Sequence, residues 1–125
     1  MSTIRSHERS ANLDTERLAS MAADIESVLE DVFRDVDQEI RHYPTPIPRC
    51  DAQFNALYEQ RTRLATEIAR FSDLNASGEK SAESIARSID AFLHSAPCSD
   101  DAAERQLRSR LQTEWLEISR RDDRR

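Results

Sequence analysis

Glycine is nearly absent from this chain of 125 residues, which contains a single one. A nucleotide-binding loop needs several glycines so that its backbone can wrap around phosphate, and one glycine cannot build such a loop. The Gly-x-Ser-x-Gly pattern of a common class of acyl-transfer enzymes is excluded for the same reason. We therefore expect a protein that is not an enzyme.

Long apolar runs are also missing, since no stretch approaches the roughly 18 consecutive apolar residues of a membrane span. The first residues, MSTIRSHERSANLD, carry charges where a signal peptide needs an apolar core. We expect a cytoplasmic protein without a membrane partner, in which the two cysteines remain thiols.

An excess of positive charge is missing, since the net charge of this acidic protein is -6, which argues against binding to the phosphate backbone of nucleic acid. Apolar residues are scarce too, at 38% against the roughly 45 to 50% that is usual for a globular domain. A core this thin favours a protein that completes its packing with a partner.

The apolar residues between Asp14 and Tyr43 repeat in steps of four and three, which is typical of a helix that packs along one side in a bundle. The seam consists of Leu18, Ala22, Ile25, Leu29, Val32, Val36 and Tyr43, and Met21, Val28, Phe33 and Ile40 widen it. We predict one long helix over 14–43, beginning at an Asp14 N-cap and preceded by a flexible arm over 1–13.

Three further segments have helical spacing of apolar residues, over 51–74, 78–95 and 100–119. Residues 120–125 alternate in charge without apolar residues, and we expect this tail to fray. The sequence thus predicts an all-α, four-helix, up-and-down antiparallel bundle with a long first helix and a single domain over 14–119.

Capping residues mark the starts of the later helices. We expect Asp51 to cap the second helix and Ser77 to cap the third. The fourth has two possible caps, Ser99 or Asp101, and Asp101 would form a capping box with Glu104.

Three prolines, Pro44, Pro46 and Pro48, end the first helix, because proline removes amide donors and restricts the residue before it. The segment 43–48 is predicted to be a stiff connector that fixes the angle between two helices. The alternative is a proline-rich ligand for an aromatic groove of another protein.

The charges of the first and last helices are complementary. Nine acidic and three basic residues lie in 14–43, whereas seven basic and four acidic residues lie in 105–125. The first and fourth helices are neighbours in the predicted topology, so we expect acidic and basic surfaces to lie side by side.

A metal or thiol site is the alternative to an interaction function. In the predicted bundle the first-to-second and third-to-fourth connections share one end, which would bring His42 and Cys50 close to His94 and Cys98. Two thiolates and two imidazoles can hold zinc, although these spacings match no common zinc motif. A disulfide between Cys50 and Cys98, or redox sensitivity of either thiol, stays open. The main expectation is that no cofactor is bound.

Arg61 interrupts the apolar stripe of the second helix. A guanidinium on that seam either extends outward to water or meets a carboxylate of the acidic first helix. We expect a structural ion pair, with Asp24, Glu30, Asp31 and Asp35 as the candidate partners.

The long first helix extends past the third helix if their ends align at the proline connection. Leu18, Met21 and Ile25 would then be partly uncovered, unless the bundle tilts to cover them. Exposed apolar stripes on monomers usually mark interfaces. We therefore predict a non-enzymatic protein-protein interaction module, an adaptor or chaperone-like bundle whose stripe packs against a second copy or a client helix.

Overall fold

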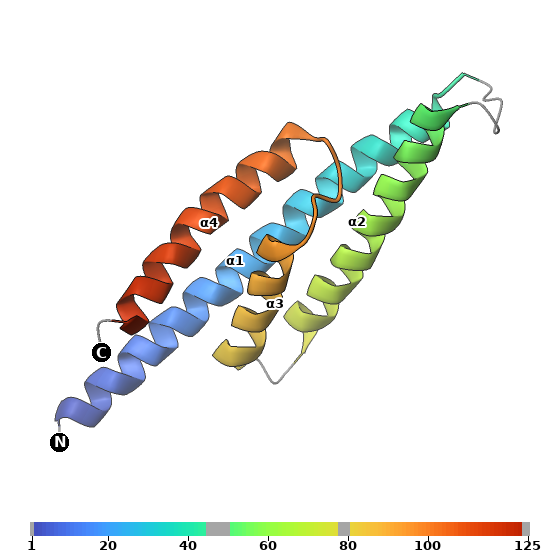
Figure 1. Ribbon diagram of the computed structural model, residues 1–125. Helices are drawn as coiled ribbons and strands as arrows, with labels where there is room; N and C mark the ends of the chain where they lie inside the picture. The colour runs from blue at the N-terminus through green and yellow to red at the C-terminus, as the bar shows by residue number, and fades with distance from the viewer. Residues whose placement is uncertain (1, 45–50, 78–80, 124–125) are drawn as a thin grey trace.

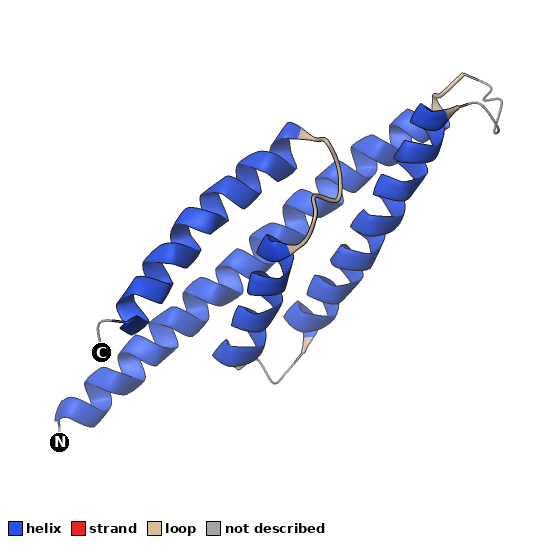
Figure 2. Ribbon diagram, in the orientation of Figure 1, coloured by secondary structure: helices blue, strands red, loops and turns tan. Residues whose placement is uncertain are grey.

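The computed structural model describes residues 2–44, 51–77 and 81–123, with side chains described between 15 and 120 within these ranges. Four helices and no strands are present there: α1 (Ser2–Arg41), α2 (Ala52–Ala76), α3 (Ala82–His94) and α4 (Ala102–Asp123). Figures 1 and 2 show α1 as the longest element, with the other three helices arranged along it. The predicted all-α class with four helices is confirmed.

The α1 helix begins earlier than the sequence predicts, at Ser2 rather than at Asp14. Asp14 therefore lies inside the helix and is not its N-cap. The reason is that residues 2–13 contain neither glycine nor proline and include several good helix formers, so nothing in them stops a helix. The flexibility expected of residues 1–13 stays a prediction. At the other end of the chain, α4 continues beyond the predicted boundary at 119 to Asp123.

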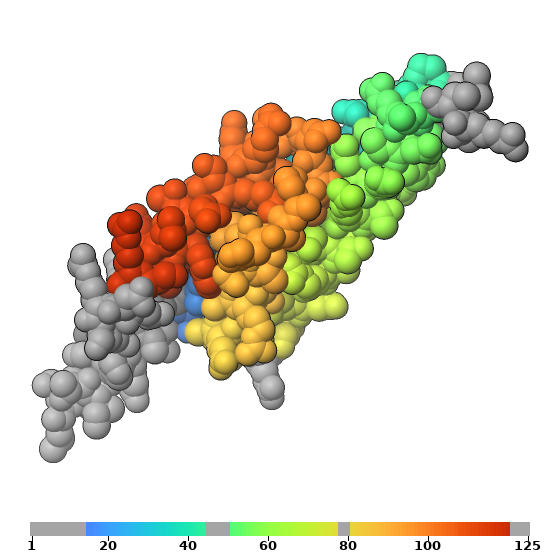
Figure 3. All heavy atoms as spheres, in the orientation of Figure 1, coloured from blue at the N-terminus to red at the C-terminus, as the bar shows by residue number. Residues whose placement is uncertain are grey.

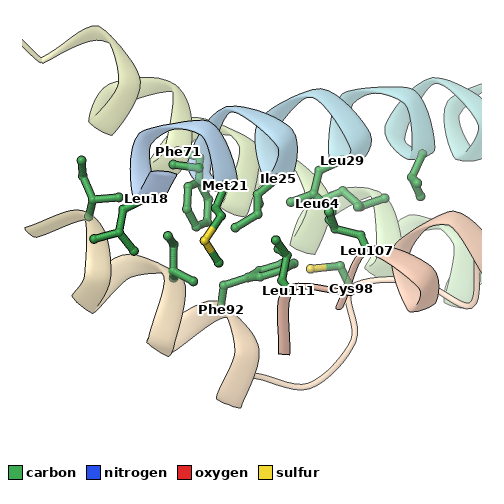
Figure 4. Close-up of a cluster of buried hydrophobic side chains, with 14 of the residues drawn as sticks. Leu18, Met21, Ile25, Leu29, Leu64, Phe71, Phe92, Cys98, Leu107 and Leu111 are labelled. Atoms are coloured by element: carbon green, nitrogen blue, oxygen red, sulfur yellow. The ribbon is translucent and has the colours of Figure 1, made fainter. Parts of the chain in front are cut away.

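The predicted seam of α1 forms the centre of the core. Six of its residues, Leu18, Ala22, Ile25, Leu29, Val32 and Val36, are buried, and the seventh, Tyr43, is half-buried. The flanking Met21 is also buried, together with Leu57, Leu64 and Phe71 of α2, Ile85, Ile89 and Phe92 of α3, and Leu107, Leu111 and Ile118 of α4. Figure 4 shows side chains from all four helices meeting along this seam. Each of the large apolar side chains in this set contributes roughly 1.5 to 3 kcal/mol by its removal from water.

The α1 and α2 helices run in opposite directions along each other. At one end the Tyr43 hydroxyl donates to Asp51 Oδ1 at 2.8 Å, and at the other the Asn75 amide donates to Glu26 Oε1 at 2.7 Å. Asp51 is the predicted N-cap of α2 and accepts from the Phe54 amide at 2.9 Å. Of the predicted proline connector, residues 45–50 lie outside the described part of the chain.

The α4 helix lies beside α1, also in the opposite direction, as two ion pairs show. Arg110 meets Asp24 at 3.4 Å, and Arg17 meets Glu117 at 3.1 Å. The first pair has the predicted arrangement, with the acidic residue on α1 and the basic residue on α4. The second pair has the opposite arrangement. Contact between the two helices was expected, but their charges are matched locally rather than by one acidic and one basic surface.

The short α3 helix packs level with the N-terminal part of the α1 seam. The Phe92 ring lies edge-on to Phe71 of α2, with 5.8 Å between centroids, and Phe71 is one turn from Asn75, which contacts Ala22 and Glu26. In Figure 3, α2, α3 and α4 cover most of α1 on the face in view.

The N-cap of α3 differs from the prediction. Its capping side chain is Ser81, whose Oγ accepts from the Ser84 amide at 3.1 Å, whereas Ser77 is the C-cap of α2. Both residues are serines, so residue type alone does not show which of them caps the helix.

Candidate interaction groove

A groove of about 500 Å³ lies between α1 and α2 and has mostly apolar walls. Its lining comes from two helices: Glu30, Phe33 and Arg34 of α1, and Ala65, Ile68, Ala69 and Ser72 of α2. Phe33 and Ile68 are half-buried and pack against the edge of the core. Their other sides form the floor of the groove, so apolar surface remains open to solvent there.

Polar bridges between α1 and α2 flank the groove in both chain directions. On one side the Arg61 Nε lies 3.3 Å from Asp37 Oδ1, and the Arg61 guanidinium lies 5.8 Å from the centroid of the Phe33 ring. On the other side is the hydrogen bond from Asn75 to Glu26. The bridges hold the two helices together, and the residues between them on the groove side are left without a covering helix.

Arg61 therefore forms the expected kind of contact, but with a different residue. Its partner is Asp37, which was not among the candidates Asp24, Glu30, Asp31 and Asp35. Asp37 follows the buried Val36, which places its carboxylate beside α2 at the level of Arg61. The Arg61 side chain is 39% exposed, so this is a partly solvated pair rather than a buried one.

Apart from Ile68, the α2 residues that line the groove have small side chains. Ala65 and Ala69 are exposed, and Ser72 is half-buried. Small side chains allow a second helix to approach closely, because the distance between packed helix axes depends on the residues at the contact.

The α1 wall carries opposite charges one turn apart, on Glu30 and Arg34. Both side chains are exposed and both line the groove. Arg34 also pairs with Asp31 on its own helix. Within the described part of the chain, no hydrogen bond or ion pair joins the Glu30 side chain to another residue.

The predicted interface residues do not form a free surface. Leu18, Met21 and Ile25 are 4%, 2% and 0% exposed within the single chain. Figure 4 shows Met21 and Ile25 beside Phe71 and Phe92. Because α3 packs level with these residues, the reason for expecting a partner there no longer holds.

The predicted metal site is not assembled by the described residues. His42 Nδ1 lies 2.9 Å from the Gln38 carbonyl oxygen, and His94 Nδ1 lies 2.8 Å from that of Asp90, so each imidazole contacts its own helix. Cys98 is buried, and Cys50 lies outside the described residues. Over 2–44, 51–77 and 81–123, no group of three or more His, Cys, Asp or Glu side chains is placed to hold a metal ion.

The position of the α3–α4 connection explains this result. Asp100 lies 3.4 Å from the Gln60 side-chain nitrogen, well inside α2, and Figure 1 shows this connection partway along α2 rather than at the level where α1 ends and α2 begins. A small polar pocket of about 290 Å³ borders it, with Asp35, Glu39, Asp100 and Asp101 in its lining. The α3–α4 connection is not level with the end of α1, so His94 and Cys98 lie away from His42.

Glu104 forms a buried polar cluster with the residues that lead into α4. It is 0% exposed, and its carboxylate accepts from the Cys98 amide at 2.8 Å and from the Ser99 hydroxyl at 2.7 Å. Arg108 completes the cluster, with its Nε 2.9 Å from Glu104 Oε2. The capping-box role predicted for Glu104 is wrong, because its partners lie before Asp101, whose own carboxylate accepts from the Ala103 amide.

Burial and the neighbouring Glu104 charge raise the pKa of the Cys98 thiol to about 11. A thiol with so high a pKa stays protonated near neutral pH and is a poor nucleophile and metal ligand. The redox sensitivity considered for Cys98 therefore has little chemical support.

Comparisons with known proteins identify no relative: no family model, curated protein or solved structure matches the chain. None of the helices in the described residues is both long enough and apolar enough to cross a membrane.

Proposed function

We propose that this protein is a non-enzymatic protein-protein interaction module, an adaptor or chaperone-like protein of the cytoplasm, built on an up-and-down four-helix bundle. The observation that carries the proposal is the apolar groove between α1 and α2. Apolar grooves on small helical domains are a common docking place for amphipathic helices of other chains.

The dimensions of the groove suit a short helix. Between Glu26 and Asp37, the α1 residues of the two polar bridges, the wall is about 16 Å long at 1.5 Å per residue. That length corresponds to three helical turns, which present apolar side chains at positions i, i+3 or i+4, and i+7 on one face. Phe33 and Ile68 supply the apolar floor, and the small residues of α2 leave room for the bound helix.

Site-specific photocrosslinking in cells of the native host tests this function. A photoreactive phenylalanine analogue replaces Ala69, which is exposed in the groove, and in a matched control replaces Ala91, which is exposed on α3. We expect a discrete covalent adduct from position 69 upon illumination and none from position 91.

The same experiment contradicts the proposal if position 69 gives no adduct, or gives the same set of adducts as position 91. Mass spectrometry of the position 69 adduct identifies the bound chain. Binding is then measured with the purified bound protein, against the Ala69→Arg and Ala91→Arg variants. A loss of affinity confined to Ala69→Arg supports the groove as the docking surface.

A further inference from the structure

The charges on the α1 wall are arranged so that the groove is complementary to itself. Glu30 and Arg34 are the charged residues of its lining, and they lie one turn apart on the same helix. The residues that line it from α2 carry no charge. A helix bound there thus meets one negative and one positive side chain, separated by about 6 Å along α1.

We propose that the occupant of the groove is a second copy of this chain, bound through the same groove across a two-fold axis that passes α1 between Glu30 and Arg34. The inference rests on the proposed function and names the partner. In a two-fold interface the contacts are reciprocal: if one residue contacts a second residue of the other copy, that second residue in turn contacts the first residue of the other copy. Two α1 helices that cross in opposite directions therefore place Glu30 of each copy opposite Arg34 of the other.

The uncharged surface of the groove is consistent with this arrangement. The small side chains of Ala65 and Ala69 allow the second chain to approach α2 closely, and its approach covers the open sides of Phe33 and Ile68. The charge pairs at the edge fix the register and direction of the two chains. Exposed charge pairs contribute more to specificity than to affinity, because like charges in the same place are strongly unfavourable.

Charge-reversal variants of the full chain test the pairing by analytical ultracentrifugation. Glu30→Arg places arginine opposite arginine, and Arg34→Glu places glutamate opposite glutamate, so each variant alone should weaken self-association at least about tenfold. An equimolar mixture of these two variants should associate again, because one supplies two bases and the other two acids. The double variant Glu30→Arg/Arg34→Glu restores opposite charges within one chain and should self-associate like the wild type.

A matched control is Glu59→Arg, which makes the same change in charge at an exposed residue of α2 outside the groove lining. It should associate like the wild type. The proposal is overturned if Glu30→Arg and Arg34→Glu each self-associate like the wild type. It is also overturned if a mixture of these two variants fails to associate while both variants remain helical by circular dichroism.

The experiment separates failure of this inference from failure of the proposed function. A wild-type chain that stays monomeric at millimolar concentration overturns the two-fold pairing. If position 69 then still crosslinks to a different protein, the groove is a docking surface for that protein and the proposed function stands. If position 69 crosslinks to nothing, both proposals fail.

Discussion

Arg108 of α4 lies over the aromatic ring of Phe92 at the end of α3, with 4.1 Å between its Cζ and the ring centroid. Its Nη1 also donates to the Phe92 carbonyl at 2.8 Å and to the Ser95 carbonyl at 3.2 Å. The side chain thereby donates to a carbonyl in the last turn of α3, which also accepts from the Ser95 amide, and to the carbonyl of the C-cap residue Ser95. One residue of α4 thus fixes the end of α3 and neutralises the buried Glu104.

Replacement of Arg108 by methionine should strongly destabilise the fold. The Arg108 side chain is 14% exposed and that of Glu104 is 0% exposed, so the variant leaves a buried carboxylate without its ion-pair partner. Loss of one member of such a pair costs about 3 to 5 kcal/mol. Urea denaturation measures the change, and Arg105→Met, at an exposed position one turn earlier, should stay within about 0.5 kcal/mol of the wild type.

Arg61→Leu should have a much smaller effect. The Arg61 side chain is 39% exposed and that of Asp37 is 16% exposed, so solvent screens their attraction. We expect a loss of less than about 1 kcal/mol in the free energy of unfolding. A loss as large as that of Arg108→Met would show that the Arg61 pair is effectively buried.

Met21→Asp should disrupt folding rather than dissociate an oligomer. Met21 is 2% exposed within the chain, and a buried carboxylate without a partner costs several kcal/mol. Circular dichroism should show loss of the cooperative thermal transition. A variant that keeps the wild-type transition and changes only its sedimentation would instead restore the interface predicted around Leu18 and Ile25.

Cys98 should be unreactive in the folded protein at neutral pH. The chain has two cysteines, so a Cys50→Ser background leaves Cys98 as the single thiol. Its modification by iodoacetamide should be slow at pH 8 and become fast after denaturation. In the native protein the rate should rise toward pH 11, where the raised pKa lies, instead of levelling near the ordinary value of 9.0.

The same thiol makes stability depend on pH in a definite direction. Well below pH 9 the thiol is protonated in both the folded and the unfolded chain, so it gives no pH dependence there. Between pH 9 and about 11 the unfolded chain releases this proton and the folded chain retains it, which favours unfolding. The unfolding free energy should therefore fall over this range, and Cys98→Ala should remove that part of the decrease.

The long seam of α1 was predictable because its repeat is sustained over many turns and matches one geometry. The placement of α3 was not, because the spacing of Ile85, Ile89 and Phe92 gives the buried side of a helix but not its level along a neighbour. Both the interface at Leu18, Met21 and Ile25 and the metal site depended on an α3 that ends beside the proline connection. The observed position of Phe92 removes the basis for both.

The groove and the Glu104 cluster show two further limits. The small residues Ala65, Ala69 and Ser72 have the composition of an ordinary exposed helix surface, and Phe33 was predicted as part of the widened seam. The side of Phe33 that faces the groove becomes evident only when the register between α1 and α2 is known. Glu104 occupies the expected third position of a capping box, and no local pattern distinguishes that role from contacts with the preceding loop.

The hydrogen bond between Tyr43 and Asp51 joins the two sides of the α1–α2 connection directly. Arg17 and Glu117 join α1 to α4 in the half of the molecule where the chain starts and ends. The packing therefore holds the end of α1 against the start of α2 without requiring a continuous covalent chain between Tyr43 and Asp51. A circular permutant that is opened in this segment, with its original ends joined by a flexible linker, should keep the same core and the same groove.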